Sequence, residues 1–134
     1  MKYALIAVAL LIPVGAYAQQ PTSFTAKYYN VGAAQPLQSD TFPVTDVVCN
    51  QAAPAAGAST VNPTRIVFAD INNAGRVCIY TTAGGAQLRS LPVGGNYEGT
   101  LTAVNAAGSS AESARAGFSR LGPPVVPTAL GFIQ

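Results

Sequence analysis

Apolar and polar residues alternate most regularly between residues 97 and 103. The two alternating sets are Gly99, Leu101, Ala103 on one side and Glu98, Thr100, Thr102 on the other. A period of two is typical of a β-strand with one face in water. Asn105 and Gly108 follow, and both residue types tolerate turns. The pattern therefore predicts a strand that ends near residue 105 and is followed by a hairpin-length loop.

Three further segments are rich in strand-forming residues and are separated by turn formers. Residues 42–49, 64–69 and 76–81 read FPVTDVVC, TRIVFA and RVCIYT. The low-complexity stretch 51–63 between the first two predicts a long flexible loop. Residues 19–41 contain one short alternating piece with Tyr28 and Tyr29, and we interpret them as an N-terminal arm carrying a weak strand. Together these elements predict an all-β fold.

Two C-terminal segments leave alternatives open. Residues 112–116 could form a helical turn, because Ala, Glu and Arg favour helix. Pairing with the 97–105 strand favours a strand over 109–120 instead. Residues 122–134 hold three prolines and then alternate at Leu130 and Phe132, which predicts an extended Pro-rich tail. This tail either packs on its own domain or adds as a strand to a neighbouring molecule.

The first 18 residues have the organisation of a secretory signal peptide. Lys2 precedes an apolar run from 4 to 14, and Ala16-Tyr17-Ala18 forms an A-x-A cleavage site. The alternative is a membrane anchor, but the run is shorter than the roughly 20 residues that span a bilayer. We expect cleavage after Ala18, release into the periplasm or medium by the general export route, and no membrane contact afterwards. The compact leader suggests a bacterium.

Composition and charge narrow the function classes. The 116 residues left after cleavage suffice for one domain, and six basic residues against five acidic ones give a net charge of +1. Such a sparse, balanced set argues against nucleic-acid binding. Disorder is conceivable at this low charge, but alternating Val, Ile, Leu, Phe and Tyr favour a folded domain.

Cys49 and Cys78 are the only cysteines in the sequence. Export would place them where disulfides persist, so we expect a Cys49–Cys78 bond, with two separate buried thiols as the alternative. A metal site would need more ligands, and the chain has no histidine. Asp70, Asn72 and Asn73 carry oxygens that suit Ca²⁺, but an ordinary Asp-Asn turn explains them as well.

The chain offers little catalytic chemistry. The absence of histidine excludes the usual Ser-His-Asp and Cys-His arrangements. Asp46, Asp70 and Glu98 could in principle form a carboxylate pair of the glycosidase type, but their spacing predicts no shared cleft. We therefore expect no catalytic residue, no cofactor and no metal, and a small glycan-active enzyme is kept only as the third functional class.

The segment from 91 to 108 resembles the E–F corner and F strand of a fibronectin type III domain. The resemblance rests on Leu91, Gly94 and Tyr97, followed by Leu101, Ala103, Asn105 and Gly108. It implies an immunoglobulin-like two-sheet β-sandwich over residues 42–121 in which the Tyr97 hydroxyl ties its strand to the corner. It also implies that 64–69 and 76–81 are strands B and C, and that the tail is similar to the start of a following domain.

The resemblance names a fold and not a function. Because the chain offers little catalytic chemistry, we expect a non-catalytic binding or structural module that contacts a protein or carbohydrate surface. End loops usually carry recognition in such folds, so the expected binding surface comprises Tyr28, Tyr29, Asn105, Ser109 and Ser110. The alternative for the tyrosine pair is that it covers a sheet edge. The alternative function is a subunit of an extracellular filament or surface assembly, a homo-oligomer formed by strand exchange through the arm or through Leu130 and Phe132 of the tail.

Overall fold

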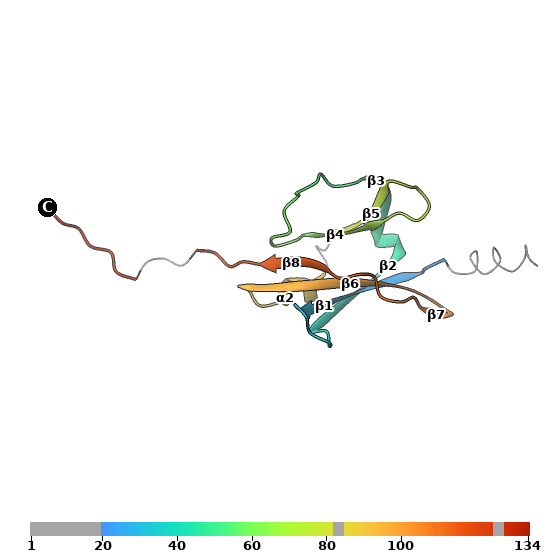
Figure 1. Ribbon diagram of the computed structural model, residues 1–134, viewed down its shortest axis with the longest axis horizontal. Helices are drawn as coiled ribbons and strands as arrows, with labels where there is room; N and C mark the ends of the chain where they lie inside the picture. The colour runs from blue at the N-terminus through green and yellow to red at the C-terminus, as the bar shows by residue number, and fades with distance from the viewer. Residues whose placement is uncertain (1–19, 82–84, 125–127) are drawn as a thin grey trace, which may run out of the picture.

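The chain folds into two antiparallel β-sheets (Figure 1). The computed structural model describes residues 20–81, 85–124 and 128–134, so the expected signal peptide lies outside the described residues. The expectation of an all-β protein with two sheets is confirmed. Within the described ranges, no helix is both long enough and apolar enough to span a bilayer.

The larger sheet has the order β2-β1-β6, and β7 and β8 both pair with β6. Its strands are β1 (Ser23–Asn30), β2 (Gln38–Pro43), β6 (Gly95–Asn105), β7 (Gly108–Ser109) and β8 (Ala116–Arg120). The smaller sheet has the order β3-β5-β4, from β3 (Val47–Ala52), β4 (Arg65–Ala69) and β5 (Arg76–Thr81). A short 3-10 helix, η1 (Val44–Asp46), joins the sheets, and helix α2 (Ala86–Ser90) lies between β5 and β6.

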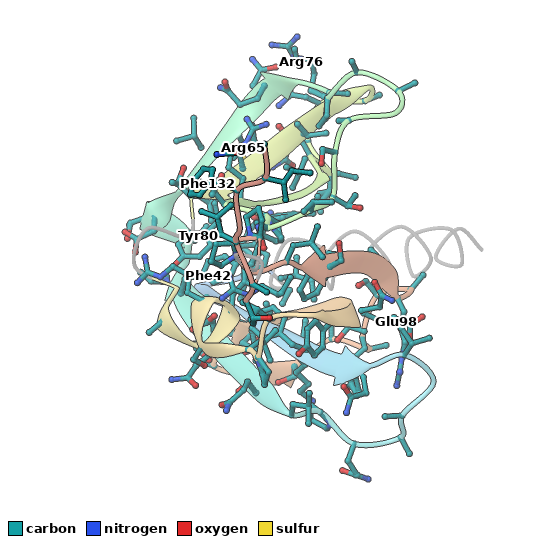
Figure 2. All side chains as sticks on the ribbon, turned by 90° about the vertical axis from the view of Figure 1, so that its left-hand side faces the viewer. Phe42, Arg65, Arg76, Tyr80, Glu98 and Phe132 are labelled. Atoms are coloured by element: carbon teal, nitrogen blue, oxygen red, sulfur yellow. A yellow bond between two sulfur atoms is a disulfide. The ribbon has the colours of Figure 1, made fainter. Side chains whose placement is uncertain are left out.

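Aromatic side chains join the two sheets. Phe42 of β2 stacks on Tyr80 of β5, with ring centroids 3.8 Å apart and planes 1° from parallel (Figure 2). Phe24 of β1 packs on Phe68 of β4 at 4.9 Å. The buried core around these contacts consists of Phe24, Ala26, Tyr28, Phe42, Tyr80, Leu88, Leu91 and Tyr97. The two sheets therefore pack face to face, as in a β-sandwich.

Residues 23–30 do not form an arm outside the domain. They form β1, which lies between β2 and β6 in the larger sheet and pairs with β6 along its whole length. Phe24, Ala26 and Tyr28 alternate into the core and are at most 9% exposed. The domain thus begins earlier than residue 42, because the alternation of these side chains buries one full face of the segment.

The expected correspondence of residues 64–69 and 76–81 to strands B and C is wrong. These residues form β4 and β5, which pair with each other in one sheet, whereas B and C lie in different sheets of an immunoglobulin-like sandwich. Residues 42–49 are also not one strand, because η1 separates the end of β2 from β3. The expected strand C would share a sheet with strand F, but the strand that lies beside β6 is β1 and not β5.

The corner before β6 is fixed by Tyr97, whose hydroxyl donates a 2.7 Å hydrogen bond to the Pro92 carbonyl. Leu91 is 2% exposed and belongs to the core. Gly94 has φ +87°, a value that favours glycine. A Cβ on Gly95 would lie 2.6 Å from the Tyr97 hydroxyl oxygen, so the tyrosine also requires glycine at that position. The geometry is that of a tyrosine corner.

The segment that follows β6 is neither a helix nor a continuous strand. After β7, the chain leaves regular pairing until β8 begins at Ala116. In between, the hydroxyl oxygens of Ser110 and Ser113 accept hydrogen bonds from the N–H groups of Ala103 and Leu101. The N–H groups of the same two serines donate to the Ala103 and Leu101 carbonyls, so serine hydroxyls replace only the backbone acceptors along this part of β6.

Candidate binding groove

The face of the larger sheet that points away from the core is polar. Its side chains are Thr25, Lys27, Tyr29, Thr41, Glu98, Thr100 and Thr102. The segment between β7 and β8 crosses part of this face and brings Glu112 onto it, where Glu112 Oε2 lies 3.6 Å from Lys27 Nζ. The candidate site is built from this sheet face and this segment.

Glu112 is the main acceptor at one end of the face. Its Oε1 accepts hydrogen bonds from the hydroxyls of Tyr29 at 2.6 Å and Thr100 at 2.7 Å. The bond from Tyr29, followed by that from Thr100, lowers the pKa of the Glu112 carboxyl below its usual value. The same bond raises the pKa of Tyr29. The carboxylate is thus held ionised by neighbours that donate to it.

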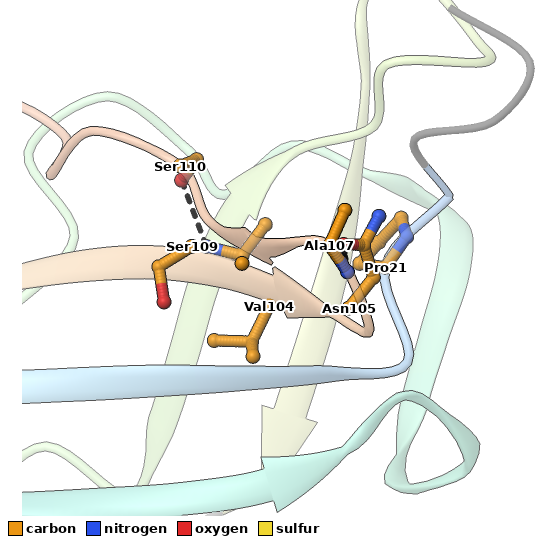
Figure 3. A pocket seen from close by; sticks show the side chains of 8 residues that line it. Pro21, Val104, Asn105, Ala107, Ser109 and Ser110 are labelled. Carbon is orange, nitrogen blue, oxygen red and sulfur yellow. Dashed lines mark hydrogen bonds between the residues drawn. The ribbon is translucent and has the colours of Figure 1, made fainter.

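Two adjoining hollows lie beside this network and together form what we call the groove. Their volumes are about 360 and 370 Å³. Both are lined by Val104, Ser109 and Ser110. The first also reaches Asn105 and Pro21, as Figure 3 shows, and the second reaches Thr25, Lys27, Thr102 and Glu112. Hydroxyls, one ammonium and one carboxylate can therefore contact a polar ligand there.

Thr102 lies on β6 and lines the second hollow. The residue is 7% exposed, and its hydroxyl is buried without a hydrogen-bond partner among the described residues. The neighbouring hydroxyls are paired, since Thr25 and Thr41 bond each other at 3.1 Å and Thr100 donates to Glu112. A buried hydroxyl without a partner costs roughly 1–3 kcal/mol, so this position is destabilising unless something bonds it.

The structure brings together some of the residues that the sequence predicted as a binding surface. Asn105, Ser109 and Ser110 all line the groove. Tyr28 and Tyr29 are 2% and 3% exposed, so they do not form an exposed patch. Tyr28 faces the core and donates to Asp40 Oδ2 at 2.8 Å, while Tyr29 lies under Arg115 on the outer face. Sequence reasoning missed Lys27, Thr102 and Glu112, because only the fold brings these three together.

Cys49 and Cys78 form the expected disulfide, with an S–S distance of 2.07 Å. The bond links β3 to β5 within the smaller sheet, where β3 is bulged. Asp70 is the third member of this cluster, but the disulfide occupies both sulfurs. The described residues therefore offer no thiolate ligand at this place.

The carboxylate of Asp70 is surrounded by donors. It accepts hydrogen bonds from the Asn50 and Asn72 N–H groups and from the side chain of Asn73, each at 2.9 Å. The Asn73 bond is the largest of the effects that lower the pKa of Asp70. Donors on both oxygens are what a carboxylate-capped turn requires.

Two of the three carboxylates considered for catalysis, Asp70 and Glu98, lie at different sheets. Asp70 follows β4 of the smaller sheet, whereas Glu98 lies on the outer face of the larger sheet. Glu98 accepts a hydrogen bond from the Gly32 N–H at 3.1 Å and pairs with Arg115 at 3.3 Å. Each of these two acids has its own local partners.

The predicted assembly residues Leu130 and Phe132 are 82% and 91% exposed, and the next residue, Ile133, is 98% exposed. The C-terminal tail leads away from the two sheets (Figure 1). These side chains are therefore available to another surface.

Comparisons with protein-family models, with curated proteins and with solved structures found no match.

Proposed function

We propose that the protein is an exported, non-catalytic module of the fibronectin III type that acts by binding a polar partner in the groove. The fold-level part of the proposal is supported by the Tyr97 corner and by the strand order of the larger sheet. In an immunoglobulin-like sandwich, strands C, F and G share one sheet. β1, β6 and β8 have that order here, and β2 lies beside β1.

The groove favours a peptide partner over a sugar. Sugar rings usually pack on aromatic faces, and none of the residues that line either hollow is aromatic. The lining offers hydroxyl groups that both donate and accept, with Lys27 and Glu112 of opposite charge. A polar peptide segment supplies matching amide, carbonyl and charged groups.

The observation that carries this proposal is the unpaired Thr102 hydroxyl. A fold selected only for stability has no reason to keep a buried hydroxyl without a partner, since valine has nearly the same shape and no polar atom. A ligand group, or a water held with the ligand, would complete its hydrogen bonding.

The test blocks the groove without touching the core. The exported protein and its Ser109→Arg variant are screened against a peptide display library and a glycan array, with Ala58→Arg as the matched control at an exposed position outside the groove. The proposal expects peptide binding that Ser109→Arg abolishes and Ala58→Arg leaves intact. Equal binding by both variants contradicts the groove, and capture of glycans alone contradicts the peptide assignment.

A second pair of variants separates ligand binding from stability. Thr102→Val should weaken binding while leaving stability equal or higher, because it removes an unpaired hydroxyl. Thr100→Val should lower stability, because it removes a 2.7 Å bond to Glu112. If Thr102→Val lowers stability as much as Thr100→Val, the Thr102 hydroxyl has a structural partner and the argument fails.

The alternative function is an assembly subunit, and the exposed tail favours it. Leu130 and Phe132 alternate in an extended segment that buries neither side chain. An apolar strand of this kind is suited to pairing with a sheet edge of another molecule.

A further inference from the structure

We propose that residues 128–133 of one copy pair with the free edge of β4 in a second copy. This inference rests on the assembly alternative of the proposed function and gives it a donor and an acceptor.

β4 pairs with β5 on one side, and no other strand of the described chain pairs with it. The Asp70 N–H donates to the Arg76 carbonyl in continuation of this ladder. Hydrogen-bonded positions alternate in an antiparallel pair, so Ile66 and Phe68 also bond β5. The backbone groups of Arg65, Val67 and Ala69 therefore point outward, toward the free edge.

The edges of β3, β6 and β8 are occupied or irregular. On the β3 edge, Asn50 is bulged with φ +57°, and its backbone carbonyl accepts a 2.7 Å hydrogen bond from Arg76. On the larger sheet, Ser110 and Ser113 cover part of β6. Ser119 of β8 bonds residues 60 and 62 through both its N–H and its carbonyl. Helix α2 lies on the core-facing side of β2, where the Asp40 carboxylate accepts from its N-terminal N–H groups.

The donor segment has the pattern that an edge strand needs. Leu130 and Phe132 fall on one side of an extended chain, and Gly131 and Ile133 fall on the other. The prolines at 123, 124 and 127 predict an extended linker before it. The described residues 128–134 lie away from the two sheets of their own chain (Figure 1). A second copy is therefore a better acceptor than the same chain.

The added tail strand would extend the hydrophobic layer between the two sheets. Ile66 and Phe68 of β4 face that layer, pack against the core and remain only partly buried. A strand added beside β4 could place Leu130 and Phe132 next to them. The smaller sheet has three strands against five in the larger sheet, so the addition also brings the two sheets closer in width.

The experiment uses two complementary variants of the exported protein, sized by light scattering over a concentration series. Phe132→Asp places a charge in the tail, which should prevent the tail from pairing, and leaves the β4 edge unchanged. Val67→Pro removes an outward-pointing N–H from the β4 edge and leaves the tail unchanged. The fold should be retained, because proline is tolerated at such edge positions. We expect the unaltered protein to form concentration-dependent oligomers and each variant alone to be monomeric. A mixture of the two variants should give one-to-one complexes and nothing larger.

Circular dichroism checks that Val67→Pro remains folded. If it does not, the double variant Val67→Cys with Gly131→Cys replaces it, because these positions would share the outer face of the added strand. An intermolecular disulfide that joins residues 67 and 131 supports the pairing, and its absence from oligomers trapped under oxidation contradicts it.

Three other outcomes overturn the inference and are distinguishable. Oligomers that survive in both variants mean that assembly uses another surface, so the assembly alternative stands and the β4 pairing is wrong. A monomer at every concentration contradicts the pairing and the assembly alternative together. If the protein is monomeric and Phe132→Asp lowers its stability, the tail packs on its own domain and the inference is wrong.

Discussion

The guanidinium of Arg115 lies directly over the ring of Tyr29, with its central carbon 3.8 Å from the ring centroid. The same guanidinium pairs with Glu98 at 3.3 Å, and the Tyr29 hydroxyl bonds Glu112. Arg115 thus covers an aromatic side chain that would otherwise be exposed on the polar face. A cation placed over an aromatic face is attracted to it electrostatically.

Replacing Arg115 by Ala should lower the free energy of unfolding by about 0.5–1 kcal/mol, the range for a cation–π contact at a solvent-exposed site, because Arg115 itself is exposed. It should also raise the exposure of Tyr29. Urea denaturation measures the first effect, and tyrosine fluorescence quenching by iodide measures the second. Arg120→Ala is not a suitable control, because its guanidinium bonds the carbonyls of residues 89 and 91. Arg65→Ala, at an exposed position, is the matched control, and an equal loss in both variants would contradict the role of the Tyr29 contact.

Replacing Tyr97 by Phe should lower the free energy of unfolding by about 1–3 kcal/mol, because the Pro92 carbonyl loses its 2.7 Å partner. The ring remains in the core, so the fold should be retained. Chemical denaturation followed by circular dichroism measures the loss. Peptide binding in the groove should be unchanged, and a variant that lost binding at full stability would contradict a purely structural role for this residue.

Removing the disulfide with Cys49→Ser and Cys78→Ala should lower the free energy of unfolding by about 2–4 kcal/mol, since the bond closes a loop across a sequence separation of 29 residues. Thermal unfolding with and without reductant gives a direct comparison. The unaltered protein should lose stability on reduction, while the double variant should not respond to reductant. A response in both would mean that the reductant acts elsewhere.

Acid should destabilise the fold through Glu112 and Asp70, whose pKa values are both lowered in the folded state. A lowered pKa gives stability that is fully present above the unfolded value, 4.5 for Glu and 3.8 for Asp, and is lost as the pH falls. The melting temperature should therefore decline below about pH 5. Glu112→Gln should flatten part of this decline, and an unchanged slope would contradict the assignment.

Alkali should destabilise the fold through Tyr28, whose pKa is raised, first by burial and then by its bond to Asp40. Burial likewise raises the pKa of Tyr80. For a raised pKa the stability is fully present below the unfolded value of 10.0 and is lost as the pH rises above it. Titration of unfolding from pH 8 to 12 measures this loss. Tyr28→Phe should be less sensitive to alkali than the unaltered protein.

The sequence predicted β6 and its corner well, because their determinants are local. Period-two alternation, Pro92, the two glycines and Tyr97 all lie within one short segment. The disulfide was also predictable, since two cysteines in a chain that is expected to be exported have one intramolecular pairing. For β1 the same local reasoning predicted a weak strand but placed it in an arm outside the domain. Its partners are distant in sequence, and alternation shows that a strand exists but not which strands lie beside it.

The groove could be predicted only in part. Asn105, Ser109 and Ser110 were identified because loops after a strand often carry recognition, and all three line it. Glu112 was placed in a segment read as strand or helix, and neither reading brings its carboxylate to Tyr29. Its position depends on the irregular backbone between β7 and β8, where serine hydroxyls replace ladder partners.

The pairing of β1 with β6 also sets the order in which the chain can fold. Ser23 lies opposite Val104, so the central strand pair of the larger sheet joins residues near the beginning of the domain to residues near its end. Contacts of such long range are slow to form and cannot begin until the ribosome has made most of the chain. The larger sheet therefore cannot be completed until residue 104 has been synthesised, and its central pairing is a late step of folding.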